Sequence, residues 1–161
     1  MYDLIIIGGG IAGMSAAICA SGRDMNFIVI ERDKLGGKVG RVSTLVNFAG
    51  VGFNESGREF IKRVEEQLQE ENVQVVYEEV QEVSLMSNPK IIRTDKNTYE
   101  AKTVILANGT NPNTGRFKGE KELMGKGVYF DPQEYGKTCE GKPVIVLGGS
   151  EYAIKEALHL A

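Results

Sequence analysis

Residues 3–18 read DLIIIGGGIAGMSAAI, and this stretch decides the fold of the chain. A short unbroken apolar run, then glycines, then residues of high helix propensity are typical of a buried parallel strand that turns sharply into a helix. In the GxGxxG spacing, Gly8 permits the tight turn, Gly10 lets the backbone approach a pyrophosphate, and Gly13 allows close packing of the helix on the strand. The start of the helix also offers N–H groups and a positive dipole end to phosphates. The stretch predicts a dinucleotide site, against the alternative of a plain strand–turn–helix.

A second apolar run supports the same prediction. Residues 27–30 read FIVI and end in Glu31, which lies about 20 residues beyond the glycine motif. An acid at the end of the second strand accepts hydrogen bonds from a ribose diol. Glu31 is therefore the candidate acceptor for the sugar of the nucleotide.

Composition limits the classes of protein that the chain can represent. Its 161 residues suffice for one domain, or for one domain plus part of another, and 42% hydrophobic with 25% charged residues is typical of a globular protein. The formal net charge of −3 gives no electrostatic reason to expect nucleic acid or an anionic membrane as a partner. The N-terminal apolar run follows Asp3 and is broken by glycines, unlike a signal peptide or a membrane span. We expect a cytoplasmic protein.

The two cysteines, Cys19 and Cys139, are too few for a disulfide framework. Cys19 falls at helical spacing on the face of the first helix that meets the sheet, so we expect it in the core rather than as a redox thiol. No cluster of His, Cys and carboxylates has metal-ligand spacing. No residue is assigned a catalytic role.

The rest of the first part alternates strands and helices and then shortens into a meander. An amphipathic helix over residues 55–72 is followed by a strand over 73–77, and the β-α-β-α-β run implies a parallel sheet in a three-layer β/α fold. Short strands with brief connections then indicate an antiparallel meander inserted in the parallel scheme. The expected segments are a helix over 10–21, meander strands over 80–86, 90–94 and 98–101, and a buried strand over 103–107.

The last part of the chain repeats the opening pattern in altered form. A linker rich in Asn, Gly and Pro covers residues 111–119, and a strand is expected at 128–130. Residues 143–147 then predict a strand, followed by a glycine turn and a helix to residue 161. In this turn Ser150 replaces the second glycine of the motif and Ala153 replaces the third. The side chain of Ser150 narrows the space through which a pyrophosphate would approach the backbone. Nucleotide binding and a simple structural turn both remain open here.

Several short motifs at these spacings fit one known pattern over nearly the whole chain. They are residues 8–13, Glu31, residues 36–38, 47–50, 107–109, 119–120, 127–128 and 148–149. With them the chain resembles the low-molecular-weight thioredoxin reductases, flavoproteins of the pyridine nucleotide-disulfide oxidoreductase family. The resemblance implies a Rossmann-type FAD-binding domain, with its N-terminal segment over residues 1–112, and the incomplete beginning of a second Rossmann-type, NAD(P)-binding domain over 117–161.

The resemblance also implies a set of cofactor contacts. FAD would lie on the first motif with Glu31 on the adenosine ribose, the segment from Gly36 to Asn47 would wrap the flavin end, and Val80 would lie near the adenine. NAD(P)H, a second candidate cofactor, would meet Gly148, Gly149 and Ser150. The FAD candidates are Gly8, Gly10, Ile11, Ala12, Gly13, Glu31, Gly36, Gly37, Lys38, Asn47, Val80, Ala107 and Gly109.

The chain departs from the family at three points, the first of which is the altered second glycine motif with Ser150 and Ala153 described above. Asp131 and Glu134 occupy the places of the two cysteines of a redox-active CxxC, and carboxylates have no thiol–disulfide couple. Cys139 has no partner at CxxC spacing. The sequence also stops inside the helix that follows the second motif, so we expect either a C-terminally truncated piece of a longer protein or a half-length homologue that a partner completes.

Two functions follow as hypotheses. The first is an FAD-dependent oxidoreductase that exchanges electrons through the flavin without a dithiol of its own, with a small redox protein, ferredoxin or thioredoxin-like, as partner. The second is a non-catalytic FAD-binding or nucleotide-binding subunit or fragment. In either case we expect a homodimer or association with a complementing chain, since an incomplete domain exposes apolar surface.

Overall fold

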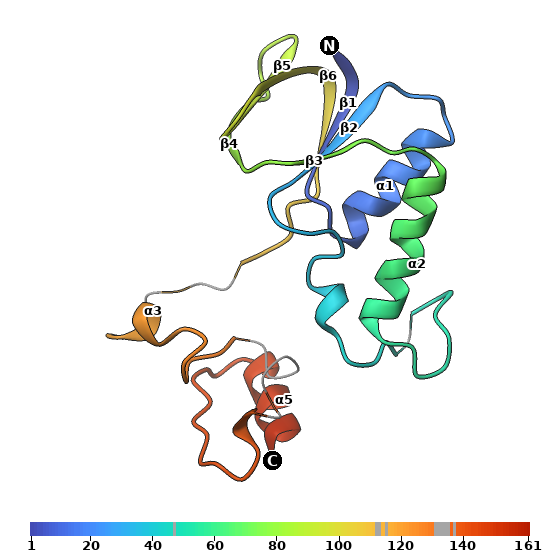
Figure 1. Cartoon of the computed structure of the whole chain (residues 1–161). Coiled ribbons are helices and arrows are strands. Elements are labelled where there is room, and N and C mark those ends of the chain that lie inside the picture. The colour runs from blue at the N-terminus through green and yellow to red at the C-terminus, as the bar shows by residue number, and fades with distance from the viewer. Residues whose placement is uncertain (47, 112–113, 115, 131–135, 137) are drawn as a thin grey trace. The chain divides into compact units, whose positions relative to one another are not determined.

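The computed structural model describes residues 1–161 except 47, 112–113, 115, 131–135 and 137. The chain divides into two compact units, Met1–Gly109 and Thr110–Ala161. The first unit contains a mixed sheet with two long helices, and the second contains short helices and loops (Figure 1). Among the described residues, no helix is both long enough and apolar enough to cross a membrane.

One six-stranded sheet organises the first unit. Its strand order is β3-β2-β1-β6-β5-β4, in which β3, β2, β1 and β6 run parallel and the pairs β6–β5 and β5–β4 are antiparallel. The parallel part and the meander of the sequence analysis are both present. The strands are β1 (Tyr2–Ile7), β2 (Phe27–Glu31), β3 (Val75–Tyr77), β4 (Val80–Ser84), β5 (Lys90–Thr94) and β6 (Thr98–Leu106).

The prediction of separate strands over 98–101 and 103–107 is wrong, because β6 runs unbroken through Lys102. Its first part pairs with β5, and its second part pairs with β1 from Ala101 to Leu106. No turn residue interrupts this segment, and the exposed side chain of Lys102 forms an ion pair with Asp3. One strand thus joins the meander to the parallel sheet.

Two helices, α1 (Ile11–Ser21) and α2 (Gly57–Glu70), lie side by side next to the sheet (Figure 1). A capping box starts α2: the Ser56 hydroxyl accepts from the backbone N–H of Glu59, and the Glu59 carboxylate accepts from the N–H of Ser56. The helix expected over 55–72 therefore begins at Gly57.

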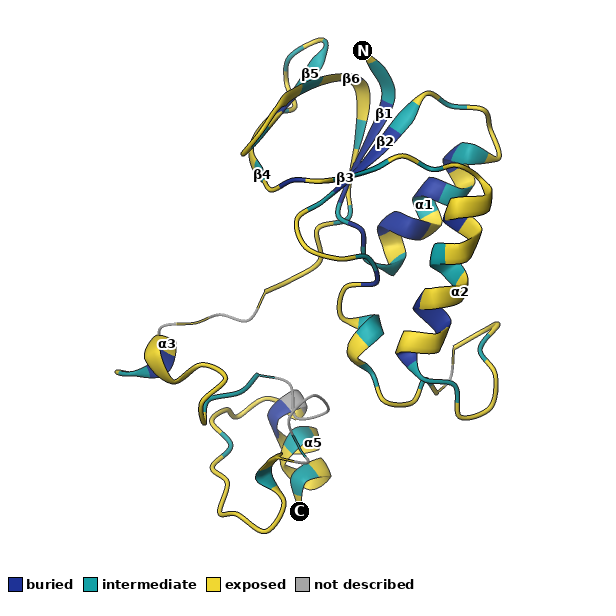
Figure 2. Cartoon of the chain, viewed as in Figure 1, coloured by how far each residue is buried: buried dark blue, intermediate teal, exposed yellow. Residues whose placement is uncertain are grey.

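The core has two parts because side chains on a strand alternate between the faces of the sheet. Leu4 and Ile6 of β1 pack with residues of α1 and α2, whereas Ile5 and Ile7 pack with Ile92 of β5. Figure 2 shows β1 and β2 as largely buried. This burial explains the continuous apolar runs of both strands.

The prediction that Cys19 lies in the core is wrong, since its side chain is exposed. The buried stripe of α1 consists of Gly13, Met14, Ala17 and Ala20. Cys19 falls outside this stripe, on the solvent side.

The second unit contains α3 (Glu120–Leu123) and α5 (Glu151–Leu160). The predictions of strands over 128–130 and 143–147 are wrong. Near the first segment a single bridge joins Met124 to Val128, and residues 143–147 are not in a strand. A strand needs a neighbour to take up its backbone hydrogen bonds, and the described residues supply none beside 143–147. Ile145 is accordingly 85% exposed.

Candidate nucleotide site

The candidate site lies where β1, β2 and β6 end. β1 has β2 on one side and β6 on the other, so the chain leaves these strands in different directions at their carboxyl ends. The N–H of Gly8 donates to the carbonyl of Ile30 at 2.8 Å. The N–H of Ala107 donates to the carbonyl of Ile7, also at 2.8 Å. Parallel α/β sheets bind ligands at such a switch point.

Two positions of the glycine motif, one in the loop after β1 and one in the first turn of α1, must be glycine because other backbone atoms approach them closely. Gly8 has φ +106°, and a Cβ atom there would lie 2.4 Å from the carbonyl oxygen of Ala107. A Cβ on Gly13 would lie 1.8 Å from the carbonyl oxygen of Gly8. The loop after β1 therefore lies closer to Ala107, and the first turn of α1 lies closer to Gly8, than a residue with a side chain would allow. The glycine motif predicts both close approaches.

Gly10 differs from both, because a Cβ atom there would meet no atom of the described residues within 4 Å. This residue is the N-cap of α1 and makes no side-chain cap, and no acidic residue lies in the first turn. Among the described residues, no acceptor is found for the N–H group of Ala12. The start of α1 thus combines open space, an available donor and a positive dipole end, which fits a phosphate group.

Glu31 ends β2 beside this loop. Its Oε2 atom accepts from the N–H of Gly9 at 2.6 Å, and its Oε1 atom accepts from the N–H of Asp33 at 2.9 Å. Each carboxylate oxygen accepts two hydrogen bonds, so capacity remains for the hydroxyls of a ribose. The Glu31 carboxylate therefore holds the glycine loop through Gly9 and lies beside that loop.

The segment after β2 returns to the glycine loop. The N–H of Gly36 donates to the carbonyl of Gly9 at 2.8 Å, and Gly36 forms an isolated parallel bridge with Gly10. Gly36 has φ +93°, and a Cβ there would lie 2.6 Å from the side chain of Ile61. Lys38 follows as the N-cap of a 3₁₀ helix, η1 (Val39–Arg41). The structure therefore brings Gly36 and Gly37 beside the first motif.

The structure places two further candidate residues, Val80 and Gly109, and leaves three others undescribed. Val80 is the half-buried first residue of β4 and packs against the core cluster that contains Ile30. Gly109 has φ +63° and faces open space. Asn47, Asp131 and Glu134 lie outside the described residues.

The second motif belongs to the second unit and is built differently. Ser150 is the N-cap of α5, where its hydroxyl accepts from the N–H of Ala153 at 3.3 Å. A Cβ on Gly148 would lie 2.9 Å from the Cβ of Ala153, whereas Gly149 faces open space. The serine that breaks the glycine pattern thus serves as a helix cap.

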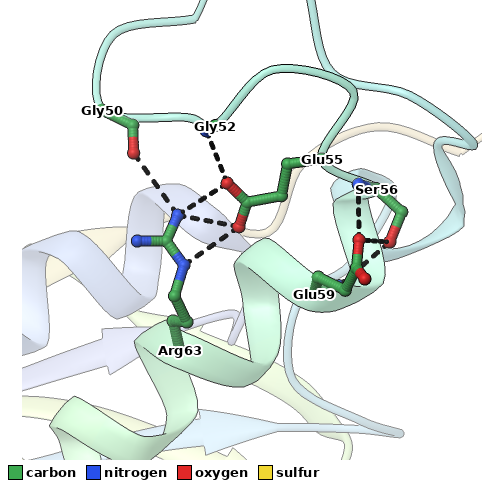
Figure 3. A network of polar contacts seen from close by, with 6 residues as sticks. All are labelled: Gly50, Gly52, Glu55, Ser56, Glu59 and Arg63. Atoms are coloured by element: carbon green, nitrogen blue, oxygen red, sulfur yellow. Dashed lines mark hydrogen bonds and ion pairs between the residues drawn. The ribbon is translucent and has the colours of Figure 1, made fainter.

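The sequence analysis missed a polar network that ties the loop before α2 to the helix (Figure 3). The Glu55 carboxylate accepts from the N–H of Gly52 at 2.7 Å and from Arg63 at 2.9 Å, and Arg63 also reaches the carbonyl of Gly50. The hydrogen bond from Gly52 and the Arg63 guanidinium lower the pKa of Glu55. Glu55 and Arg63 are eight residues apart across a loop–helix junction, and no sequence pattern relates them.

Comparison with known proteins identifies the family. The family model for pyridine nucleotide-disulphide oxidoreductases matches residues 2–161. The chain belongs to this family. It is 38% identical over 166 residues to a thioredoxin reductase of Peptoclostridium acidaminophilum, covering 100% of this chain and 51% of that protein. It is 32% identical to a 34.2 kDa protein in the rubredoxin operon of Clostridium pasteurianum, covering 98% of this chain and 51% of that protein.

Solved structures agree with this assignment. A thioredoxin reductase from Lactococcus lactis in the FR conformation superposes with a TM-score of 0.86 at 29% identity, over 99% of this chain and 52% of the other. A ferredoxin-flavin thioredoxin reductase from Clostridium acetobutylicum gives 0.65 at 32% identity, over 99% and 55%. The predicted Rossmann-type fold and the resemblance to thioredoxin reductases are confirmed. The chain spans about half the length of the curated relatives it matches.

Proposed function

We propose that this chain is the nucleotide-binding part of an FAD-dependent oxidoreductase related to thioredoxin reductases, and that it works without a redox dithiol of its own. One observation carries the proposal: the open backbone at Gly10 and the start of α1 lie at the same sheet edge as the carboxylate of Glu31. A dinucleotide needs both features, because its diphosphate takes N–H donors and its ribose takes an acceptor.

The described residues fit FAD at its diphosphate and adenosine ribose. Gly10, Ile11 and Ala12 would donate backbone hydrogen bonds to the diphosphate, and Glu31 would accept from the ribose hydroxyls. Following the resemblance, Gly36, Gly37, Lys38 and Asn47 would lie toward the flavin, with Val80 near the adenine and Ala107 and Gly109 along the edge. In this proposal residues 1–112 form the FAD-binding segment, and residues 117–161 begin an NAD(P)-binding domain.

FAD, when bound, supplies the electron-transfer chemistry, and the chain binds and orients it. The sequence holds only Cys19 and Cys139, so it contains no CxxC. A dithiol relay needs two thiols at exchange distance. We therefore propose direct exchange of electrons with a partner, for which NAD(P)H, a ferredoxin and a thioredoxin-like protein are the candidates. Similarity to a thioredoxin reductase and to a ferredoxin-flavin thioredoxin reductase supports the thioredoxin-like protein and the ferredoxin as candidates.

The lack of CxxC in the sequence also favours a second candidate, a non-catalytic FAD-binding subunit or fragment. Such a protein would associate with a second copy or a complementing chain in the cytoplasm. The two candidates differ in whether the bound flavin is reduced by a physiological donor.

An anaerobic reduction experiment separates them. The purified chain is reconstituted with FAD and mixed with NADH, NADPH and reduced ferredoxin in separate stopped-flow runs. Bleaching of the oxidised flavin band by at least one donor within seconds supports the oxidoreductase. Stable binding of FAD without bleaching by any donor supports the binding subunit instead.

A further inference from the structure

Glu78 is the one buried acid of the first unit among the described residues, with 8% of its surface exposed. Its carboxylate accepts hydrogen bonds from the Thr94 hydroxyl at 2.6 Å, the Asn97 side-chain amide at 2.7 Å and the Tyr99 hydroxyl at 2.9 Å. A buried carboxylate with three donors is well satisfied. The network therefore fixes this residue against the turn between β5 and β6.

The backbone around Glu78 makes further bonds to the same turn. The N–H of Glu79 donates to the Asp95 carboxylate at 2.8 Å, and the N–H of Asp95 returns a bond to the carbonyl of Glu79 at 2.9 Å. Lys96 reaches the carbonyl of Tyr77 at 2.6 Å. The connection from β3 to β4 is thus held by both side chains and main chain.

The curvature of the sheet explains why these groups meet. β3 and β4 are the two end strands of the sheet, yet only Glu78 and Glu79 separate them in the chain. Two linking residues span at most about 11 Å between the Cα atoms of their neighbours, whereas a flat six-stranded sheet is about 24 Å wide. The sheet must curl, and Glu78 lies where its two ends approach.

Glu78 is also bonded to the candidate site. Its N–H donates to the carbonyl of Glu31 at 2.9 Å, and Tyr77 is the register partner of Glu31 between β3 and β2. The carboxylate of Glu31 in turn accepts from the N–H of Gly9 in the glycine loop. One continuous set of hydrogen bonds therefore runs from the β5–β6 turn through Glu78 and Glu31 to the loop.

We propose that Glu78 is a positioning residue for Glu31: it anchors the main chain at the end of β2 and so sets the place of the Glu31 carboxylate beside the glycine loop. This inference rests on the proposed function, because it assumes that Glu31 holds the ribose of a nucleotide. The hydrogen bond from Thr94 and those from Asn97 and Tyr99 lower the pKa of Glu78, which keeps its carboxylate ionised as an acceptor. Burial and the bond to Glu78 raise the pKa of Tyr99, which remains a donor.

A double-mutant cycle with ADP as the probe tests the proposal. Affinity for ADP is measured by calorimetry for the wild-type chain, Glu78→Gln, Glu31→Gln and the double variant, at a temperature where circular dichroism shows each to be folded. Glu78→Gln should raise the Kd for ADP about fivefold. Because Glu78 acts through Glu31, the double variant should bind within about twofold of Glu31→Gln alone.

Controls separate positioning from general stability. Leu68→Met alters a buried side chain of α2, in the other core cluster, and lowers stability by less than about 1.5 kcal/mol without touching the network, so its Kd should match the wild type. Glu82→Gln is a second control. Glu82 is an acid of the β4–β5 hairpin that forms an exposed ion pair with Arg93, and its replacement should also leave the Kd unchanged. If Glu78→Gln does not fold, Thr94→Val and Tyr99→Phe each remove one donor to the carboxylate and should raise the Kd in the same way.

The outcomes are distinct. An unchanged Kd in Glu78→Gln, or losses that multiply in the double variant, would overturn the positioning role while leaving the nucleotide site intact. A wild-type chain that does not bind ADP would overturn the proposed nucleotide site and this inference with it.

Discussion

Gly10, the N-cap of α1, and Gly13, in the first turn of the helix, are three residues apart. Among the described residues, a Cβ atom on Gly10 would meet nothing within 4 Å, whereas a Cβ atom on Gly13 would lie 1.8 Å from the carbonyl oxygen of Gly8. The absence of a side chain therefore has a different role at each of the two glycines. Gly13 is needed by the folded chain itself, whereas no described residue occupies the space that a side chain on Gly10 would take. Substitution at these two positions separates folding from ligand binding.

Gly10→Ala should lower stability only slightly and weaken nucleotide binding. Gly10 has φ −69° and ψ 177°, which alanine adopts without strain. Its Cβ would enter the space through which a diphosphate approaches the backbone. Because alanine caps a helix less well than glycine, the melting temperature should fall by only about 2–4 °C, and the Kd for ADP should rise at least about tenfold. An unchanged Kd would show that the diphosphate does not lie there.

Gly13→Ala should behave in the opposite way, as a folding defect. The added methyl group cannot fit beside the carbonyl of Gly8, so α1 must move away from the loop. Overpacking of this kind lowers the free energy of unfolding by about 1–3 kcal/mol or more. Urea denaturation followed by circular dichroism measures the loss, and a variant as stable as the wild type would refute the close packing of α1.

Ser56→Ala should destabilise α2 through loss of its N-cap. The Ser56 hydroxyl accepts from the N–H of Glu59, and without it this N–H loses its side-chain acceptor. We expect a loss of about 1 kcal/mol in the free energy of unfolding. Ser56→Thr, which keeps a hydroxyl acceptor, should retain most of the stability; equal loss in both variants would contradict the cap.

The ionised network at Glu78 predicts a specific pH dependence of stability. Its pKa is lowered in the folded chain, so its contribution is present above the unfolded pKa, about 4.3, and is lost as the pH falls through the folded pKa. The difference in melting temperature between the wild type and Glu78→Gln should be constant above about pH 5.5 and shrink below about pH 4. Asp3, Glu55 and Glu59 also have lowered pKa values, but they titrate in both proteins and cancel in the difference. A difference that grows on acidification would contradict the ionised network.

Local patterns account for what the sequence could predict. The glycine spacing and the acid that ends β2 depend on contacts between adjacent elements, so the turn, α1 and the place of Glu31 follow from residues 3–31 alone. The capped start of α2 likewise follows from Ser56 and Glu59, three residues apart. These features need no knowledge of distant parts of the chain.

Features that depend on distant partners were not predictable. Glu78 follows a strand and by its type is expected in solvent, but its three donors lie 16 to 21 residues further along and meet it only because the sheet curls. The apolar segment 143–147 has the composition of a strand, but a strand also needs neighbours, which the described residues do not provide. Lys102 looked like a break between two strands, whereas an exposed position in one long strand accepts a lysine readily.

Equilibrium titration of the purified chain with FAD tests the central claim most directly. Flavin fluorescence is followed during the titration of the wild type, Glu31→Gln and Gly10→Ala, with circular dichroism as the check on folding. We predict saturable binding of one FAD per chain by the wild type, and weaker binding by both variants at unchanged secondary structure. A folded wild-type chain that fails to bind FAD, or variants that bind as tightly as the wild type, would contradict the account.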